Sequence, residues 1–122
     1  MAQATKPGFA DVKVVRALAS EMPDEYLQCR DLGHSWQSHS AAEASAKARK
    51  AGVWYERTLR CRRCHTMRAQ QLSRRGEVRA NQYDYPAGYQ TPDGTGRIAG
   101  AARDVLRITG VLREVAAAGG HR

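Results

Sequence analysis

The chain has 122 residues, of which 42% are hydrophobic and only 7% aromatic, and it carries a formal net charge of +8 at pH 7. This length suits one small domain with tails and excludes two independent hydrophobic cores. A chain with so few aromatic residues can form only a small hydrophobic core, which usually needs a metal, disulfides or a partner chain to be stable. The positive charge favours polyanionic partners, nucleic acid first.

Membrane and export signals are missing from the sequence. The first 22 residues lack the apolar run of about 7–15 residues that marks a secretion signal, and no stretch approaches the ~18 apolar residues of a membrane span. Three cysteines cannot all pair as disulfides. We therefore expect a cytoplasmic protein with no membrane segment.

The amino-terminal quarter predicts a loose arm followed by a helix. Residues 1–8 are expected to form a flexible arm. Over residues 9–21 the apolar positions recur at the spacing of one face of a short amphipathic helix. Pro23 ends that helix, and residues 24–27 are expected to add one further turn.

The middle of the chain predicts three antiparallel strands. Residues 53–61, 66–72 and 77–85 have strand character, and the turn CRRCH joins the first two. Residues 38–52 are polar and rich in alanine, and we expect a loop or an exposed short helix there.

The carboxyl-terminal part returns to a helical period. An apolar stripe runs through residues 97–115, and Thr95 is a reasonable N-cap. This helix, at 97–116, is expected to pack on the rest of the protein or on a partner.

Two short pairs of cysteine and histidine carry the clearest chemistry. They are Cys29-x4-His34 and Cys61-x2-Cys64, and the second lies in the turn between two predicted strands. Zinc prefers four soft or borderline ligands in a tetrahedron, and each short pair presents two of them from one side. The sequence therefore predicts one structural zinc ion held by these four residues.

Other histidines could be the fourth ligand, and the cysteine motif could serve a purpose other than zinc binding. His39 or His65 can replace His34, although His65 directly follows Cys64, which makes chelation by both awkward. Cys-x-x-Cys-His is also the attachment motif of c-type haem, but the lack of an export signal and of a wide apolar pocket disfavours haem. Free thiols without a metal are the remaining alternative.

Together these elements predict an α+β fold. It is a small zinc ribbon, a three-stranded antiparallel sheet flanked by an amino-terminal and a carboxyl-terminal helix. Residues 9–90 would form the zinc-ribbon domain with its amino-terminal helix.

Arginines and aromatic residues crowd around the predicted knuckle and hairpin. Arginine can bind phosphate bidentately, and aromatic rings can stack on unpaired bases. The alternative is that the aromatic side chains form the core and the arginines a solvated face. The candidate nucleic-acid contacts are Arg57, Arg60, Arg62, Arg63, Arg68, Arg74, Arg75 and Trp54.

Catalytic motifs are not found in the sequence. The carboxylates are few and scattered, and there is no glycine-rich phosphate loop, nucleophile elbow or His-Glu-x-x-His helix. We therefore expect a protein that is not an enzyme.

The stretches CRDLGHSW, YERTLRCRRCHTMR and YDYPAGY resemble small zinc-ribbon proteins of actinobacteriophages, over roughly residues 26–89. The resemblance implies a phage or prophage protein that works in the bacterial cytoplasm, and it does not by itself give a ligand. His65 departs from zinc ribbons in general, which often place glycine after the second cysteine of the knuckle.

The leading hypothesis is a non-catalytic zinc-ribbon protein that binds DNA or RNA, as a phage regulator of transcription. The alternative is an interaction module that binds and modulates a host protein through the helix at 97–115 and the basic hairpin. In either case we expect a monomer or a homodimer.

Overall fold

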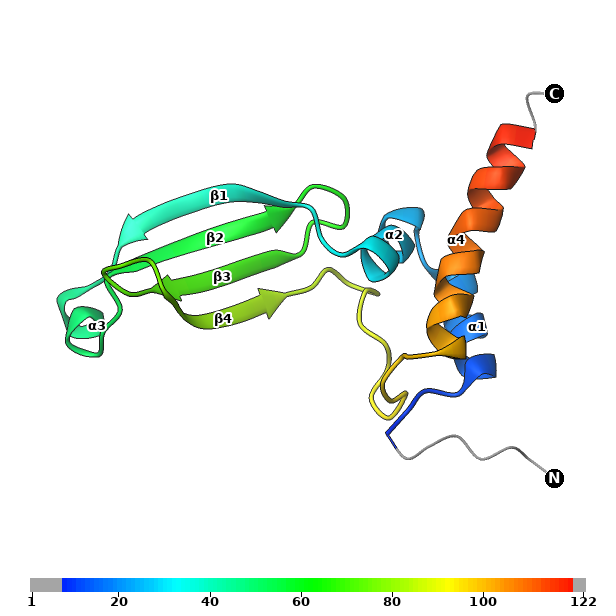
Figure 1. Cartoon of the computed structure of the whole chain (residues 1–122), viewed down its shortest axis with the longest axis horizontal. Coiled ribbons are helices and arrows are strands. Elements are labelled where there is room, and N and C mark those ends of the chain that lie inside the picture. The colour runs from blue at the N-terminus through cyan, green and yellow to red at the C-terminus, as the bar shows by residue number, and fades with distance from the viewer. Residues whose placement is uncertain (1–7, 120–122) are drawn as a thin grey trace. The chain divides into compact units, whose positions relative to one another are not determined.

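The computed structural model describes residues 8–119 (Figure 1). They form an α+β fold with a four-stranded antiparallel sheet, helices before it and one long helix after it. The predicted class is confirmed, whereas the predicted number of strands, three, is wrong. The chain divides into two compact units, which we call the sheet unit (His34–Ala87) and the helical unit (described residues 8–33 and 88–119). All but the last residue of the predicted arm at 1–8 lies outside the described residues.

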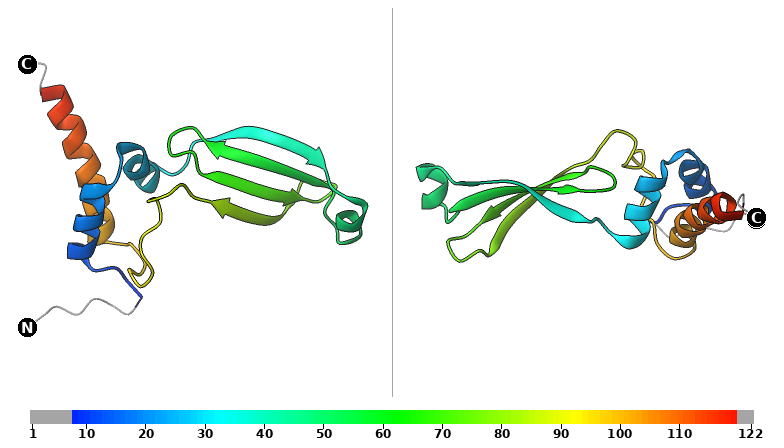
Figure 2. Two further views of the ribbon diagram at one scale, coloured as in Figure 1. Left: turned by 180° about the vertical axis from the view of Figure 1, so that it is seen from behind. Right: turned by 90° about the horizontal axis from the view of Figure 1, so that it is seen from above.

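The helical unit consists of α1 (Val12–Glu21), α2 (Asp24–Leu32) and α4 (Ala101–Gly119). Both α1 and α2 pack against α4, and the views in Figures 1 and 2 show α1 beside α4. The predicted turn at 24–27 is the start of a nine-residue helix. The core of this unit is formed by Ala10, Val15, Ala19, Met22, Leu27, Ala102, Val105 and Leu106. None of the helices described in the structure is long and apolar enough to span a membrane.

The long helix α4 begins later than the sequence predicts. Gly100 has a φ of +56°, a left-handed conformation, and the helix starts at the next residue. Arg97 lies in extended chain instead, where its carbonyl accepts a 2.7 Å hydrogen bond from the N–H of Ala10. Thr95 does not cap α4, because its hydroxyl donates to a carbonyl three residues earlier, in its own turn.

A single arginine ties α4 to the end of α1. The Arg113 guanidinium donates to the backbone carbonyls of Ala19, Ser20 and Met22. It also pairs with the Asp24 carboxylate at 2.9 Å. The last carbonyls of a helix lack partners within the helix, so this side chain satisfies groups that would otherwise depend on water.

The sheet unit contains four strands in the order β1-β2-β3-β4. They are β1 (Trp36–Glu43), β2 (Tyr55–Cys61), β3 (Met67–Leu72) and β4 (Val78–Asp84), and the short helix α3 (Ala46–Lys50) lies between β1 and β2. The strands twist relative to one another, as Figure 2 shows. The last three strands agree with the predicted ones to within two residues at each end.

The first strand, β1, corrects the prediction for residues 38–52. Its sequence, WQSHSAAE, is made mostly of small polar residues, and every residue after Trp36 is exposed. A strand exposed on both faces shows no alternation of apolar and polar residues, so the usual pattern is missing. The short helix that the sequence allowed in this stretch is α3, which the Ser45 side chain caps.

The pairing register gives the sheet two different faces. Arg68 pairs with Leu59 of β2 and Tyr83 of β4, and residues directly opposite in antiparallel strands share a face. The face that holds Trp36, Leu59, Arg57, Arg68 and Tyr83 is called the aromatic face below. The opposite face carries mainly small side chains, among them Ser40, Ala42, Thr58, Ala69 and Ala80.

Candidate metal centre

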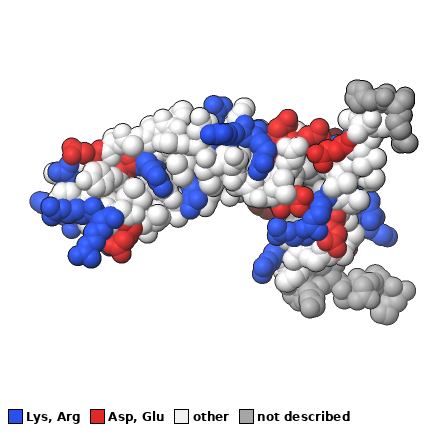
Figure 3. All heavy atoms as spheres, turned by 45° about the horizontal axis from the view of Figure 1, so that its top comes forward, with Lys and Arg blue, Asp and Glu red and all other residues white. Residues whose placement is uncertain are grey.

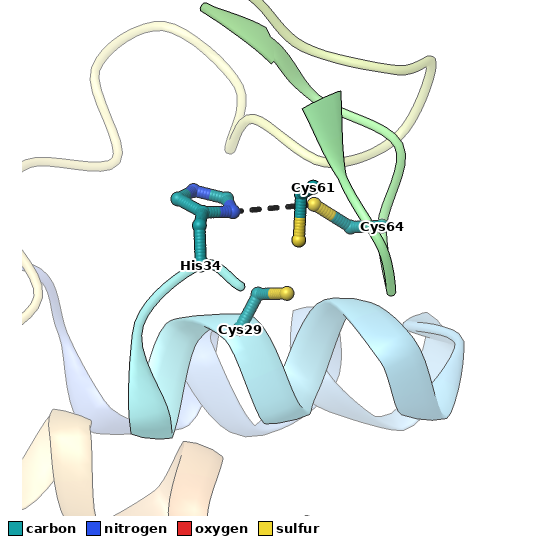
Figure 4. A group of neighbouring side chains, drawn as sticks. All are labelled: Cys29, His34, Cys61 and Cys64. Atoms are coloured by element: carbon teal, nitrogen blue, oxygen red, sulfur yellow. Dashed lines mark hydrogen bonds between the residues drawn. The ribbon is translucent and has the colours of Figure 1, made fainter. Parts of the chain in front are cut away.

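Three cysteines and one histidine converge in the folded chain (Figure 4). The ligand atoms of Cys29, His34, Cys61 and Cys64 all lie within 4.8 Å of one another. The three cysteines are buried, with at most 3% of each residue exposed, and His34 is half-buried. Four tetrahedral ligands around zinc stand about 3.3–3.8 Å apart, given bond lengths of about 2.0–2.3 Å. The cluster therefore has the donor atoms to hold a metal ion such as zinc, and its ligand atoms would have to draw together by up to about 1 Å to surround it.

The first ligand pair is positioned by the end of α2. Cys29 lies in the last turns of this helix, and the N–H of Gly33 donates to its carbonyl at 2.9 Å. Gly33 has a φ of +86°, and a Cβ at this position would meet no atom within 4 Å. Glycine is thus needed here for backbone conformation rather than for space, and the left-handed turn it makes delivers His34 to the cluster.

The second pair is positioned by the turn between β2 and β3. The N–H of Cys61 donates to the carbonyl of Thr66 at 2.9 Å, and the N–H of His65 donates to the carbonyl of Cys61 at 3.1 Å. A third bond, from the N–H of Arg62 to the carbonyl of Ser35 at 2.9 Å, ties this turn to the segment that follows His34. Figure 4 shows the sulfur atoms of both cysteines turned toward the other ligands.

His65 occupies the position where zinc ribbons often have glycine. Its φ is +66°, and it is the only described residue other than glycine with a positive φ. Histidine, like asparagine and aspartate, visits this left-handed region more often than most residues. The turn therefore has a left-handed residue after Cys64 even though that residue is not glycine.

The positions of the histidines in the structure show which of them can be the fourth ligand. His65 is exposed on the outside of the turn, and His39 is exposed on β1. Neither belongs to the cluster, whereas His34 does, with its Nδ1 at 3.3 Å from the Cys64 Sγ. Of the three candidates, only His34 is placed to be the fourth ligand.

The surroundings favour thiolates over thiols. Burial alone would raise the pKa of the Cys61 thiol, but hydrogen bonds from the backbone of Cys64 and Arg63, from His34 and from the backbone of Ser35 lower that pKa to about 5. The hydroxyl of the fully buried Thr66 lies 3.0 Å from the Cys64 Sγ and can donate to it. Because metals bind the thiolate, both features suit a metal centre.

The candidate nucleic-acid contacts are distributed over several places in the sheet unit. Arg57 and Arg68 lie on the aromatic face, and Arg60 lies on the opposite face of β2. Arg62 and Arg63 lie in the turn between β2 and β3, and Arg74 and Arg75 lie in the turn between β3 and β4. The Trp54 ring has two guanidinium groups close to it, Arg49 at 5.1 Å and Arg74 at 5.2 Å from its centroid.

Several residues of this region are not among the sequence candidates. Trp36 and Tyr83 lie on the aromatic face with Arg68 between them, and Tyr85 stacks on Tyr83 with centroids 5.8 Å apart. Tyr83 and Tyr85 alternate along the chain, which is a strand signal, but Trp36 belongs to the strand that the sequence did not reveal. The one feature of the sequence that pointed to Trp36 is its position two residues after the candidate ligand His34.

The positive charge is concentrated in the sheet unit. Residues 34–87 hold 11 lysines and arginines against 4 aspartates and glutamates, whereas the rest of the chain holds 9 against 8. On the side shown in Figure 3, lysines and arginines gather at the end of the sheet that carries α3. The sheet unit therefore has a net charge of +7, almost the whole excess of the chain.

Comparisons with known protein families, with curated proteins and with solved structures found no match.

Proposed function

We propose that this chain is a non-catalytic zinc-ribbon protein that binds nucleic acid through its sheet unit. The donor set supports zinc as the metal, because three buried thiols and one imidazole are ligands that zinc prefers. Since the protein itself supplies all four ligands, no position is left for a substrate or a catalytic water. The role proposed for zinc is therefore structural.

The observation that carries the nucleic-acid part is the division of charge between the two units. A net charge of +7 within 54 residues, against +1 in the remainder, would attract a polyanion to the sheet unit. Eight of the eleven basic residues there are arginines outside α3, and arginine binds phosphate in a bidentate manner.

The test is a titration of the zinc-loaded protein against DNA and RNA at two salt concentrations. Each phosphate contact releases counterions, so binding should weaken at least about tenfold between roughly 50 and 200 mM salt. Replacing Arg74 and Arg75 together with glutamine should weaken binding and reduce the salt dependence. The matched control is Arg103→Gln on the exposed surface of α4, which should bind as the parent does. Failure to bind any nucleic acid at low salt would refute the proposal.

A second function is favoured by the exposed surface of α4. Four apolar side chains spaced three or four residues apart are between 39% and 58% exposed: Ile108, Val111, Leu112 and Val115. Two of them, Ile108 and Leu112, line a shallow groove of about 540 Å³ between α1 and α4. Apolar helix faces of this kind bind partner proteins, here a host protein or a second copy of the chain. A partner captured from host extract that survives nuclease treatment, and is lost with Leu112→Glu, would support this function.

A further inference from the structure

The aromatic face contains a contiguous cluster of rings with an arginine inside it. The Arg68 guanidinium lies 5.6 Å from the Trp36 ring centroid and 5.4 Å from that of Tyr83, and these two rings are 6.2 Å apart. Tyr85 extends the cluster by stacking on Tyr83 with the two planes only 7° apart. Three strands thus contribute to one surface, since Trp36 comes from β1, Arg68 from β3 and Tyr83 from β4.

This surface is accessible, and it is not simply a core. Tyr83 is 42% exposed, whereas Trp36, Arg68 and Tyr85 are half-buried. The buried apolar residue next to them is Leu59, which pairs with Arg68. The Trp36 ring also packs on the His34 ring, with the two centroids 4.8 Å apart, so Tyr83 is the most exposed ring of the cluster.

Two guanidinium groups on this face are held in place by a chain of side-chain hydrogen bonds. Arg57 Nε donates to Gln70 Oε1 at 2.7 Å, and Gln70 Nε2 donates to Asn81 Oδ1 at 3.0 Å. Arg68 Nε donates to the same Asn81 oxygen at 2.8 Å. Each arginine uses one of its five N–H donors in this chain, and the terminal donors that bind phosphate side-on remain.

The charges on the face match an anion, and the opposite face does not. Arg68 lies among the rings and Arg57 shares the face with it, and the only carboxylate on the strands of this face is that of Glu43, which pairs with Arg49 at 3.4 Å. On the opposite face, Glu56 and Asp84 accompany Arg60, and no aromatic side chain is present on the strands. The features that recognise a nucleotide, hydrogen-bonded guanidinium groups and a partly exposed tyrosine ring, therefore occur together on one face.

We infer that the aromatic face binds single-stranded nucleic acid, with unpaired bases stacked on Tyr83 and Trp36 and phosphates held by Arg57 and Arg68. This inference rests on the proposed function and makes it specific. In a duplex the bases are already stacked and paired, so their faces are not available to a protein ring. A single strand offers both the base faces and the flexible backbone that such a surface needs.

The test compares three ligands for the zinc-loaded, full-length protein: a thymidine oligomer of roughly 12 nucleotides, an abasic oligomer of the same length and the matching duplex. The thymidine oligomer should bind about 5- to 100-fold more tightly than the abasic one, which offers phosphates without bases. Tyr83→Leu should remove most of this difference, and Tyr83→Phe, which keeps the ring, should retain it. Metal content and circular dichroism establish that both variants are folded.

A second readout does not depend on a variant at the site. The chain has two tryptophans, so Trp54→Phe leaves Trp36 as the only one. Its fluorescence should be quenched by the thymidine oligomer and not by the abasic oligomer. Equal binding of all three ligands, with no quenching of Trp36, would overturn this inference and leave the proposed function standing. Binding to none of them would overturn both.

Discussion

Removal of the metal is expected to unfold the sheet unit and to leave the helical unit folded. The sheet unit has five buried hydrophobic residues, and two of them are the candidate ligands Cys61 and Cys64. The largest of the other three are Val53 and Leu59, which are 8% and 9% exposed. Burying these two side chains contributes about 3–6 kcal/mol, whereas a structural zinc ion contributes about 10–16 kcal/mol at neutral pH.

The helical unit differs because its core contains eight buried residues and no zinc is needed to fill it. The only ligand that it contributes is Cys29, near the end of α2. Chelation should therefore remove most of the stabilisation of β2 and β3 while α1 and α4 remain packed on one another.

Hydrogen exchange followed by mass spectrometry measures this directly. In the zinc-loaded protein, amides of the central strands β2 and β3 should be protected, and after chelation they should exchange at the rate of an unfolded chain. Amides of α4 beyond its first turn, residues 105–110, should keep their protection and act as the internal control. If protein shown to contain no metal retains protection in β2 and β3, zinc is not what holds the sheet unit together.

Four smaller predictions address individual residues. His65→Gly should stabilise the zinc-loaded protein by about 0.5–1 kcal/mol, since relief of left-handed strain exceeds the added chain entropy, and a higher midpoint of thermal unfolding would show it. Leu27→Ala should cost about 2–5 kcal/mol in chemical denaturation of the helical unit, because this side chain is 1% exposed. Arg113→Lys, which keeps the charge but cannot reach several carbonyls at once, should cost about 1–2 kcal/mol in the same assay, and an unchanged midpoint would argue against the role given to this side chain. Acidification should release zinc, since protons compete for the thiolates. The Cys61 thiol has its pKa lowered from 9.0 to about 5, so the stabilisation it gives is fully present above pH 9.0 and is lost as the pH falls through about 5.

The candidate metal ligands could be predicted from the sequence because their spacing alone limits the geometry. Cys61 and Cys64 lie in a tight turn between two strands whose residues alternate, and that turn fixes both sulfur atoms. The choice of His34 over the other two histidines required the structure, because it depends on the left-handed turn at Gly33. Nothing in the sequence distinguishes a glycine that makes such a turn from one that does not.

The strand β1 and the start of α4 could not be predicted, for opposite reasons. In β1 the side chains after Trp36 are exposed on both faces, so the sequence of this strand shows no alternation of apolar and polar residues. At the start of α4 the helical pattern extends beyond the helix, because Ile98 is apolar and packs on the core although it lies before the first residue of the helix. A periodic pattern of apolar residues shows which side chains are buried. It locates the end of a helix only where side-chain burial and backbone conformation change at the same residue.

The arrangement of β1 and β2 also determines how this protein can change in evolution. Trp36 pairs with Cys61 next to the metal ligands, whereas Glu43 pairs with Tyr55 at the other end of the same two strands, next to α3. Residues inserted or deleted around α3 leave the ligands where they are. Two residues added to each strand also preserve the face on which every side chain lies, whereas one residue added to each reverses it. In divergent homologues the number of residues between the two ligand pairs should therefore vary freely through insertions around α3. Insertions within the two strands should change that number in steps of four, two residues in each strand.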